Sequence, residues 1–448
     1  MSNTPEPLAA FGAACLPSVI EGERGIGGRL KERPEDFLVE EQPLYQPSGG
    51  GEHAYLFVEK RGVSTLEMVG IIAGHFGVRE RDVGYAGLKD KQAITRQVVS
   101  VWMPGRTVSD VPMLRHERVA ILWADRHINK LRPGHLAGNR FSIRVRGVEP
   151  AAALAARRVL NRLAREGIPN IVGPQRFGPV EANHLVGRAL ILDRPGEALD
   201  ALLGPSRDHP AAQAEARAHY ARGEFALAAG AFPRSLRAER CAATLLARGV
   251  SAHHVVRALG RTALAFYASA FQSAVFNRVL AARLREGTLS TLAAGDLAFM
   301  HASRATFMVR EAELADPRTP ERLRDFEISP SGPMWGAAMR RAEGAPGAAD
   351  LDALRACAVT PEDIERFAAE GGAIEGARRP LRVRLTDPEV EGGVDEHGAY
   401  VRCAFDLPRG SFATVVMHML MGAGGAAPGS PPGGVEHSED DGRGWDHE

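Results

Sequence analysis

NRFSIRVRG, at residues 139–147, is the stretch whose pattern decides the fold class. Successive side chains of a strand point to opposite faces of its sheet, and here apolar and polar residues alternate. Phe141, Ile143 and Val145 therefore predict a core face, and the opposite face carries Arg140, Ser142, Arg144 and Arg146. An arginine face suits a sheet that meets phosphates, but a solvated face or pairing with acids of an inserted domain fits the same pattern.

Strands and helices also flank this stretch on both sides. AYLFVEK (54–60) and TRQVVSVW (95–102) are typical of strands, and a capping box at Ser64 predicts a helix to about Phe76. DVGYAG predicts a short strand that leads into the polar loop LKDKQA. After the arginine strand, Pro150 predicts the start of a helix that runs to about Glu166.

The pattern then changes to mostly helical from about 168 to 376, with the clearest helix at 262–286. Strand patterns return at LRVRL (381–385) and VRCAFDL (401–407). Ser411 is the predicted N-cap of a last helix at 411–420. We therefore expect an α+β protein whose body is interrupted by an inserted helical domain.

Net charge is zero over the 448 residues, but the charges are unevenly distributed. Residues 424–448 hold six acids and one arginine, and this Gly- and Pro-rich tail is expected to be disordered. Residues 115–146 hold eight Lys or Arg and two acids. Such a basic stretch favours a local surface for a polyanion, although a solvated charged face gives the same composition.

Several classes of protein lack support in this sequence. No apolar run reaches 18 residues, and the N-terminus has no signal-peptide pattern, so we expect a cytoplasmic protein without membrane contact. The histidines show no metal-binding spacing, and the cysteines are far apart: Cys15, Cys241, Cys357 and Cys403. We therefore expect no metal and no other cofactor.

The stretch GYAGLKDKQAITRQ (84–97) carries the candidate chemistry. Gly84 and Gly87 allow a sharp turn or a close approach of backbone to a ligand. Asp90 lies between Lys89 and Lys91, and nearby cations favour the ionised carboxylate that a nucleophile requires. An exposed turn with three solvated charges would give the same triplet, and the pattern is not that of a P-loop.

The same stretch resembles the signature of the TruD family of tRNA pseudouridine synthases, which bears that family's catalytic aspartate. Further stretches resemble family motifs in the family's order and together span about 25–423: KERPEDFLVEE (31–41), GNRF (138–141), PN (169–170), GPQRFG (173–178), ISPSGPM (328–334) and FDLPRGSFAT (405–414). One departure is that Ile171 and Val172 stand where the family often has Tyr-Phe, which removes an aromatic side chain.

The resemblance implies a mixed-sheet pseudouridine-synthase core interrupted by a mostly helical TRUD domain. On this basis we expect a catalytic domain formed by 1–168 and 377–423, an inserted domain at 169–376 and a tail at 424–448. The implied reaction converts uridine to pseudouridine without a cofactor, at position 13 in the D-stem of tRNA-Glu. The implied partner is tRNA, and no protein partner is implied.

The resemblance also implies roles for individual residues. Asp90 is the expected nucleophile, and it could attach covalently either to the sugar or to the base. The flipped base needs an aromatic surface and polar groups, for which Phe37, Asn139, Phe141 and Phe412 are candidates, with Lys31 binding phosphate or supporting Asp90. The predicted RNA contacts are Lys89, Arg96, Arg140, Arg144, Arg146 and Arg176.

Two other functions are compatible with parts of this pattern. A non-catalytic RNA-binding or RNA-remodelling protein could keep the same scaffold, but the intact Asp90 motif disfavours it. A glycosidase or nucleotide hydrolase would need a second positioned carboxylate or a metal, and no such pair is evident near Asp90.

Overall fold

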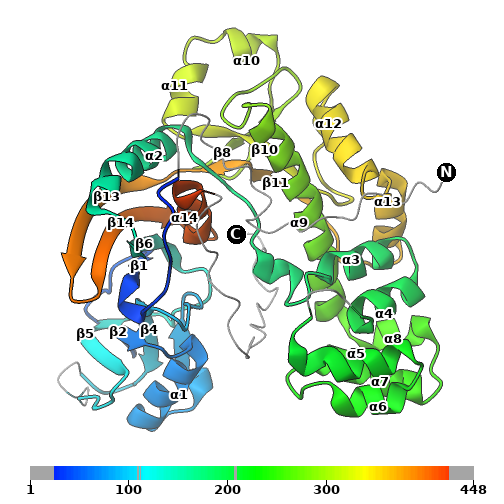
Figure 1. The fold of residues 1–448 in the computed structure, drawn as a ribbon, viewed down its shortest axis with the longest axis horizontal. Helices are drawn as coiled ribbons and strands as arrows, with labels where there is room; N and C mark the ends of the chain where they lie inside the picture. Colours follow the sequence, from blue (N-terminus) through cyan, green and yellow to red (C-terminus); the bar gives the residue numbers. More distant parts are fainter. Residues whose placement is uncertain (1–24, 108–109, 111–112, 206–208, 423–448) are drawn as a thin grey trace. The chain divides into compact units, whose positions relative to one another are not determined.

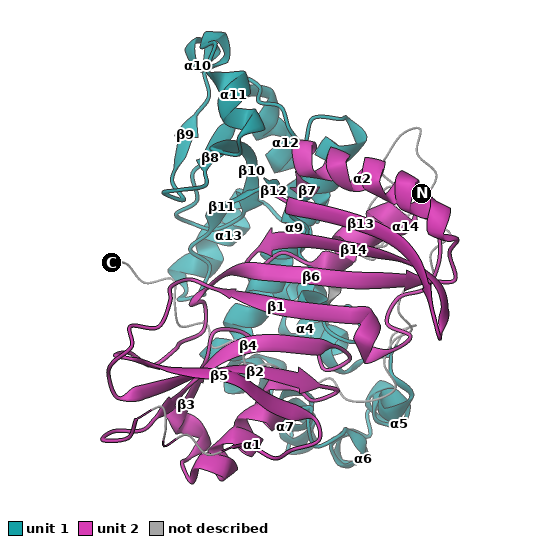
Figure 2. Cartoon of the chain, turned by 90° about the vertical axis from the view of Figure 1, so that its left-hand side faces the viewer, with its two compact units in different colours: residues 1–17, 169–382, 431–448 teal, residues 18–168, 383–430 magenta. Residues whose placement is uncertain are grey.

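The structure, a computed structural model, describes residues 25–422 apart from 108–109, 111–112 and 206–208. The tail predicted at 424–448 therefore lies outside the described residues. The described chain divides into two compact units (Figures 1 and 2). Unit 2 comprises 25–168 and 383–422, and unit 1 is the single segment 169–382. None of the described helices combines the length and the apolar character needed to cross a membrane.

Unit 2 is built from strands with a few helices. Its elements are β1 (Phe37–Pro43), β2 (His53–Arg61), α1 (Thr65–Phe76), β3 (Val83–Tyr85), β4 (Ile94–Trp102), β5 (Val119–His127), β6 (Leu136–Arg146), α2 (Ala153–Glu166), β13 (Thr386–Asp395), β14 (Gly398–Pro408) and α14 (Ala413–Met421). The chain passes to unit 1 through β7 (Ile168–Pro169) and returns through β12 (Arg382–Val383).

An eight-stranded mixed sheet forms the centre of unit 2, and Figure 2 shows it face on. Its strand order is β13-β14-β6-β1-β4-β2-β5, with β3 paired to β4. β1 and β4 are parallel, whereas β1 and β6 are antiparallel. This mixed sheet, together with its helices, confirms the predicted α+β class.

One face of the sheet is apolar because buried residues alternate along its strands. Leu56 and Val58 of β2 and Val99 of β4 belong to one core cluster with Met68 and Ile72 of α1. Burying such side chains contributes about 1.5–3 kcal/mol each. The predicted capping box is present, since Ser64 accepts from the Glu67 amide and Glu67 accepts from the Ser64 amide. We call this side of the sheet the helix face and the other side the open face.

β6 confirms the alternation on which the fold prediction depends. Phe141, Ile143 and Val145 are buried on the helix face. Gly138 lets β14 approach closely, since a Cβ there would lie 2.3 Å from the Leu407 carbonyl oxygen. Gly84 of β3 similarly lets the segment between β5 and β6 approach, since a Cβ there would lie 2.3 Å from the Leu131 carbonyl oxygen. Both glycines therefore permit packing of backbone on backbone.

Unit 1 contains most of the helices of the described chain. Its elements are α3 (Asn183–Ile191), α4 (Pro195–Leu203), α5 (Ala214–Ala221), α6 (Phe225–Ala231), α7 (Arg237–Ala247), α8 (Ala252–Ala258), α9 (Arg261–Arg285), β8 (Leu297–Met300), β9 (Thr306–Met308), α10 (Glu311–Ala315), α11 (Thr319–Arg324), β10 (Ile328–Met334), α12 (Gly344–Arg355), α13 (Pro361–Ala369) and β11 (Ala377–Pro380).

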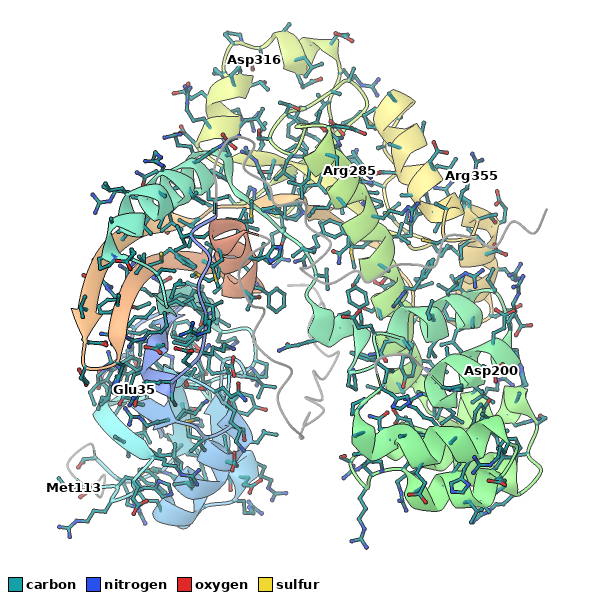
Figure 3. All side chains as sticks on the ribbon, in the orientation of Figure 1. Glu35, Met113, Asp200, Arg285, Asp316 and Arg355 are labelled. Atoms are coloured by element: carbon teal, nitrogen blue, oxygen red, sulfur yellow. The ribbon has the colours of Figure 1, made fainter. Side chains whose placement is uncertain are left out.

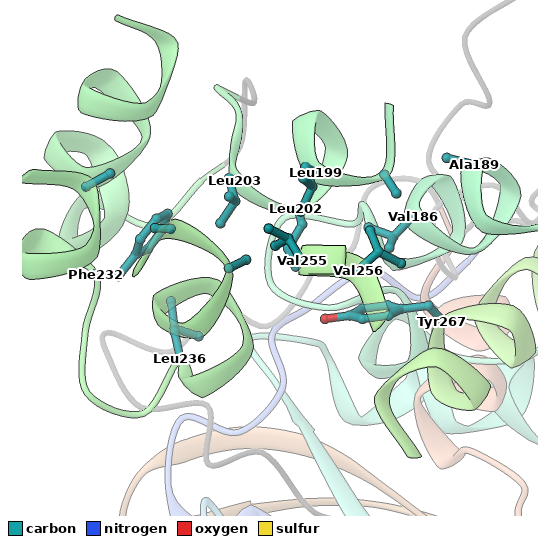
Figure 4. Packing of buried hydrophobic residues seen from close by; sticks show 14 of the residues in the cluster. Val186, Ala189, Leu199, Leu202, Leu203, Phe232, Leu236, Val255, Val256 and Tyr267 are labelled. Carbon is teal, nitrogen blue, oxygen red and sulfur yellow. The ribbon is translucent and has the colours of Figure 1, made fainter. Parts of the chain in front are cut away.

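The core of unit 1 joins α3, α4, α8 and α9. Val186, Leu199, Val255 and Tyr267 meet in this cluster, which Figure 4 shows. Charged side chains such as Arg285 lie at the surface of the unit (Figure 3). The helix predicted at 262–286 is confirmed as α9.

Two details of the sequence prediction were wrong, and two features were not predicted. Unit 1 also contains a four-stranded sheet, β11-β10-β8-β9, whose short strands lack a clear alternation. In place of the strand predicted at 381–385, the structure has only the two residues of β12. The longer strand β13 follows it and was not predicted, because it lies at the edge of the sheet and many of its residues are exposed. Ser411 is not the N-cap of α14, because Phe412 holds that position and no side chain caps the helix.

Candidate active site

Asp90 lies on the loop between β3 and β4, and buried side chains hold the main chain of this loop. The Lys60 ammonium donates to the Val63 carbonyl at 2.6 Å and to the Asp90 carbonyl at 2.9 Å. Thr65 Oγ1 accepts from the Lys89 amide at 2.9 Å. Buried polar groups need such partners, and here their partners are the backbone of the loop. The position of Asp90 is thereby fixed from beneath.

The Asp90 carboxylate has two partners and remains open to solvent. Its Oδ1 accepts from the Gln92 amide at 2.9 Å, and its Oδ2 is ion-paired with Lys31 Nζ. The side chain of Asp90 is 37% exposed, whereas that of Lys31 is 14% exposed. A charge-assisted contact of this kind fixes the orientation of the carboxylate. The geometry therefore presents an anion at the surface of the unit.

Lys31 reaches Asp90 from a backbone conformation that non-glycine residues rarely adopt. Its φ is +56°, and its ammonium lies 4.5 Å from the centroid of the Phe37 ring. Strain of this kind, about 1–3 kcal/mol, clusters at functional sites. Of the two roles predicted for Lys31, this geometry favours support of Asp90.

The two lysines that flank Asp90 in the sequence have other partners. Lys89 Nζ lies 2.6 Å from Glu41 Oε2 and donates to Asn139 Oδ1 at 2.9 Å. Lys91 pairs with Glu67 at 3.1 Å. The side chain of Lys89 is only 5% exposed and its ammonium contacts protein groups, so its role as an RNA contact stays a prediction. The cation that touches Asp90 comes instead from position 31.

Burial shifts the pKa values of two side chains that pack against the Asp90 loop, Glu41 and Lys60. It raises the pKa of the Glu41 carboxyl, and Lys89 opposes that shift. It lowers the pKa of the Lys60 ammonium to about 8, and the nearby Asp90 opposes that shift. Both directions follow from the cost of holding a charge away from water.

The aromatic candidates lie on the helix face beside these charges. Phe37 and Phe141 form an edge-to-face pair with centroids 6.4 Å apart, and Phe141 also contacts Phe405 at 5.8 Å. Phe37 and Phe141 are buried, so each is also a core residue. Phe412 is half-buried, and no hydrogen bond or ring contact within the described residues joins it to the Asp90 cluster.

The arginines of β6 lie on the open face and are paired with acids of the same unit. Across β2, β4, β1, β6 and β14 runs a line of alternating charge, which we call the charge row: Glu59, Arg96, Glu40, Arg140 and Asp406. Arg96 lies 2.8 Å from Glu59 and 3.2 Å from Glu40, and Arg140 lies 2.7 Å from Asp406. Opposite charges on neighbouring strands stabilise a sheet.

Arg146 was predicted to contact RNA, and this role stays a prediction, but its guanidinium is buried among carboxylates. Its guanidinium is 3% exposed and pairs with Asp36 at 2.6 Å and Asp395 at 2.7 Å. Arg144 is 35% exposed and pairs with Asp395 at 3.4 Å. The pairing partners belong to unit 2, so the alternative that they lie in the inserted domain is wrong.

Arg176 lies in unit 1, where its guanidinium stands 5.4 Å from the centroid of the Phe266 ring. The two positions that depart from the family pattern are buried in the same unit. Both the amide and the carbonyl of Val172 bond to the Asn277 side chain, and Ile171 is a core residue. Ile171 and Val172 therefore contribute to the packed interior of unit 1.

Sequence reasoning missed the polar residues that hold the loop from beneath. They are Glu41, Lys60, Thr65 and Gln97, all of them buried. Periodicity could have found two of them. Glu41 follows Phe37 and Val39 at a spacing of two, and Lys60 follows Leu56 and Val58 in the same way. A charged residue at a core position of a strand indicates a specific partner.

These contacts place an oriented, solvent-exposed carboxylate beside the helix face of a mixed sheet. Comparison with known proteins identifies the family of this chain. The family model described as tRNA pseudouridine synthase D (TruD) matches residues 17–420. The chain belongs to this family, and with it to the isomerases.

Two curated relatives and one solved structure show the extent of the similarity. The tRNA pseudouridine synthase D of Geobacter sulfurreducens is 44% identical over 89% of this chain and 94% of its own. That of Geobacter metallireducens is 42% identical over 90% of this chain and 97% of its own. A crystal structure described as tRNA pseudouridine synthase D from Methanosarcina mazei matches with a TM-score of 0.79, at 25% identity, over 92% of this chain and 97% of that one.

Proposed function

We propose that this chain isomerises uridine to pseudouridine in tRNA, with Asp90 as the nucleophile. The observation that carries the proposal is the half-exposed Asp90 carboxylate, held by Lys31 and by the Gln92 amide within the family's motif. Such a carboxylate is fixed in place and open to a substrate, as covalent catalysis requires.

The reaction breaks the bond between N1 of the base and C1′ of the sugar, turns the base, and joins C5 to C1′. C5 then loses its proton and N1 gains one, so the product is an isomer of the substrate. A carboxylate can hold the sugar or the base covalently while the base turns, and that bond breaks again when the product forms. The chemistry has no redox step, so the residues of the chain can supply it. In this proposal Lys31 keeps the Asp90 carboxylate oriented until it attacks.

The target base must leave its stack to reach Asp90. We propose that Asn139 bonds to the edge of the flipped base and that the rings of Phe37 and Phe141, which are almost fully buried, form the apolar floor on which the base rests. Their common position on the helix face supports this assignment. Unit 2 is then the catalytic domain, and unit 1 is the inserted TRUD domain.

The proposed substrate is uridine at position 13 of the D-stem of tRNA-Glu, as the family resemblance implies. The relatives' names specify tRNA and support that class of substrate. A cytoplasmic location, where tRNA is available, stays a prediction.

The two alternatives receive less support from the geometry. A purely RNA-binding protein has no need of a strained lysine paired with an exposed carboxylate. A hydrolase would need a second available carboxylate, but Glu41 is buried between Lys89 and the Val98 amide.

Purified protein should form pseudouridine at one position of tRNA-Glu, as mapped by mass spectrometry. Asp90→Asn keeps the shape and removes the charge, so turnover should fall at least about a thousandfold while tRNA affinity stays within a few-fold. Asp82→Asn, at a partly buried acid that pairs with Arg79 at 3.1 Å, is the control and should leave turnover unchanged. Turnover by Asp90→Asn within a few-fold of wild type would show that another group is the nucleophile.

A further inference from the structure

The amide of Asn139 is held in one orientation by a buried ion pair. Glu41 of β1 lies directly opposite Asn139 of β6 in the sheet. Lys89 Nζ lies 2.6 Å from Glu41 Oε2 and 2.9 Å from Asn139 Oδ1. The side chains of Lys89 and Glu41 are 5% and 1% exposed, so solvent cannot easily replace either partner.

An ammonium group has donors only, so it can meet Asn139 through Oδ1 but not through Nδ2. Rotating the amide by half a turn would exchange a charge-assisted bond for two opposed donors. The bond from Lys89 is the one hydrogen bond of the Asn139 side chain within the described residues, and Asn139 is half-buried. Its Nδ2 is therefore available as a donor to a ligand.

We propose that Glu41 and Lys89 are positioning residues that make Asn139 a donor to the target base, at O4 of uracil. This inference rests on the proposed function, because it assumes that Asn139 meets the flipped base. Cytosine carries an amino group where uracil carries O4, so the amino group and Asn139 Nδ2 would both be donors and could not bond to each other. The Glu41–Lys89–Asn139 chain, which we call the amide lock, thereby determines specificity for uracil.

The test uses substrate tRNA with uridine or 4-thiouridine at the target position, because sulfur accepts a hydrogen bond weakly. Loss of one good hydrogen bond, about 1.5 kcal/mol, should slow single-turnover isomerisation by wild type about tenfold with 4-thiouridine. Lys89→Met frees the amide to rotate. It should lower the rate on uridine and reduce the uridine-to-4-thiouridine ratio toward one, with little change in tRNA affinity.

Lys91→Met is the matched control, since Lys91 lies on the same loop and pairs with Glu67. It should leave the ratio at the wild-type value. Lys89→Met leaves Glu41 buried without its partner, so Glu41→Gln/Lys89→Met, which removes both charges, provides the same test if the single variant is unstable. Asn139→Asp keeps an acceptor for Lys89 and removes the donors, so its rate on uridine should fall at least tenfold.

The outcomes separate the two proposals. A wild-type protein that forms no pseudouridine would refute the proposed function. A wild type that isomerises both substrates equally fast would show that O4 receives no donor. A Lys89→Met variant that slows both substrates by the same factor would give Lys89 a purely structural role and overturn the amide lock.

Discussion

The two faces of the sheet in unit 2 both carry charges of both signs, but they pair these charges differently. On the open face, the charge row alternates acid and base across five strands and neutralises its own arginines. On the helix face, the charges are fewer and mostly buried, and the cluster leaves one carboxylate, Asp90, open to solvent. The comparison shows that a charge's partner and its exposure indicate its function better than the number of charges does.

The same comparison indicates which charges contribute to RNA affinity and which contribute to the stability of the fold. Arginines that are already paired within a sheet gain little from a phosphate, because the new contact replaces an existing one. Half-exposed pairs such as Arg140–Asp406 contribute about 0–1 kcal/mol each. We therefore expect the open face to support the sheet, and we expect substitutions on the two faces to affect different measurements.

The largest effect is expected for a buried arginine. Arg146→Met should lower the free energy of unfolding of unit 2 by about 3–5 kcal/mol, because it leaves the carboxylate of Asp36 buried without its partner. Urea denaturation followed by circular dichroism measures this loss. Arg144→Met, in the same strand but 35% exposed, should cost less than about 1 kcal/mol. Equal losses in both variants would contradict the distinction between buried and exposed pairs.

The second effect concerns the cation that contacts Asp90. Lys31→Met should slow isomerisation about tenfold to a hundredfold, since a hydrogen bond to a charged group contributes about 1.5–3 kcal/mol. The melting temperature should change little, because Asp90 is 37% exposed and water can replace its partner. Single-turnover rates measure the effect, and Lys91→Met serves as the control. Unchanged turnover would exclude Lys31 from the site.

The third effect is a pH dependence of stability. Burial lowers the pKa of Lys60 to about 8, although Asp90 and Glu67 oppose the shift and Lys89 and Lys91 add to it. Between about pH 8 and 10.5, the unfolded chain then binds a proton that the folded chain has released, so this residue's contribution to stability rises with pH.

Unfolding of wild type and Lys60→Met across this pH range isolates that contribution from other titrating groups. The stability of wild type relative to the variant should increase with pH. A constant difference would mean that Lys60 keeps its proton in the folded state.

The smallest effect is expected on the open face. Arg140→Ala and Arg96→Ala should leave the slope of log affinity against log salt concentration for tRNA unchanged, because their guanidinium groups pair with acids. A phosphate contact would instead flatten the slope by roughly 0.7–0.9 per residue. Binding titrations at several salt concentrations distinguish these outcomes. A flattened slope would show that the open face contacts the phosphates of the RNA.

The sequence alone was sufficient where a pattern is local. The alternation at 139–147 predicted β6, and the capping box at Ser64 predicted the start of α1. The Asp90 motif located the loop that carries the exposed carboxylate. Sequence reasoning was less successful where strands are short or lie at an edge, as in β9 and β13, because few of their residues are buried and alternation is weak.

The sequence by itself therefore determined the α+β class, the family and the position of Asp90, since each depends on the order of residues along the chain. Only the tertiary structure decided which charges meet. Lys31 is 59 residues from Asp90 in sequence, and Arg146 is 110 residues from Asp36. The Lys89–Asp90–Lys91 triplet suggested two cations on one carboxylate, yet the fold directs those lysines to Glu41 and Glu67. Ion pairs form between groups that are close in space, and that closeness depends on strand order and register, which no single stretch of sequence specifies.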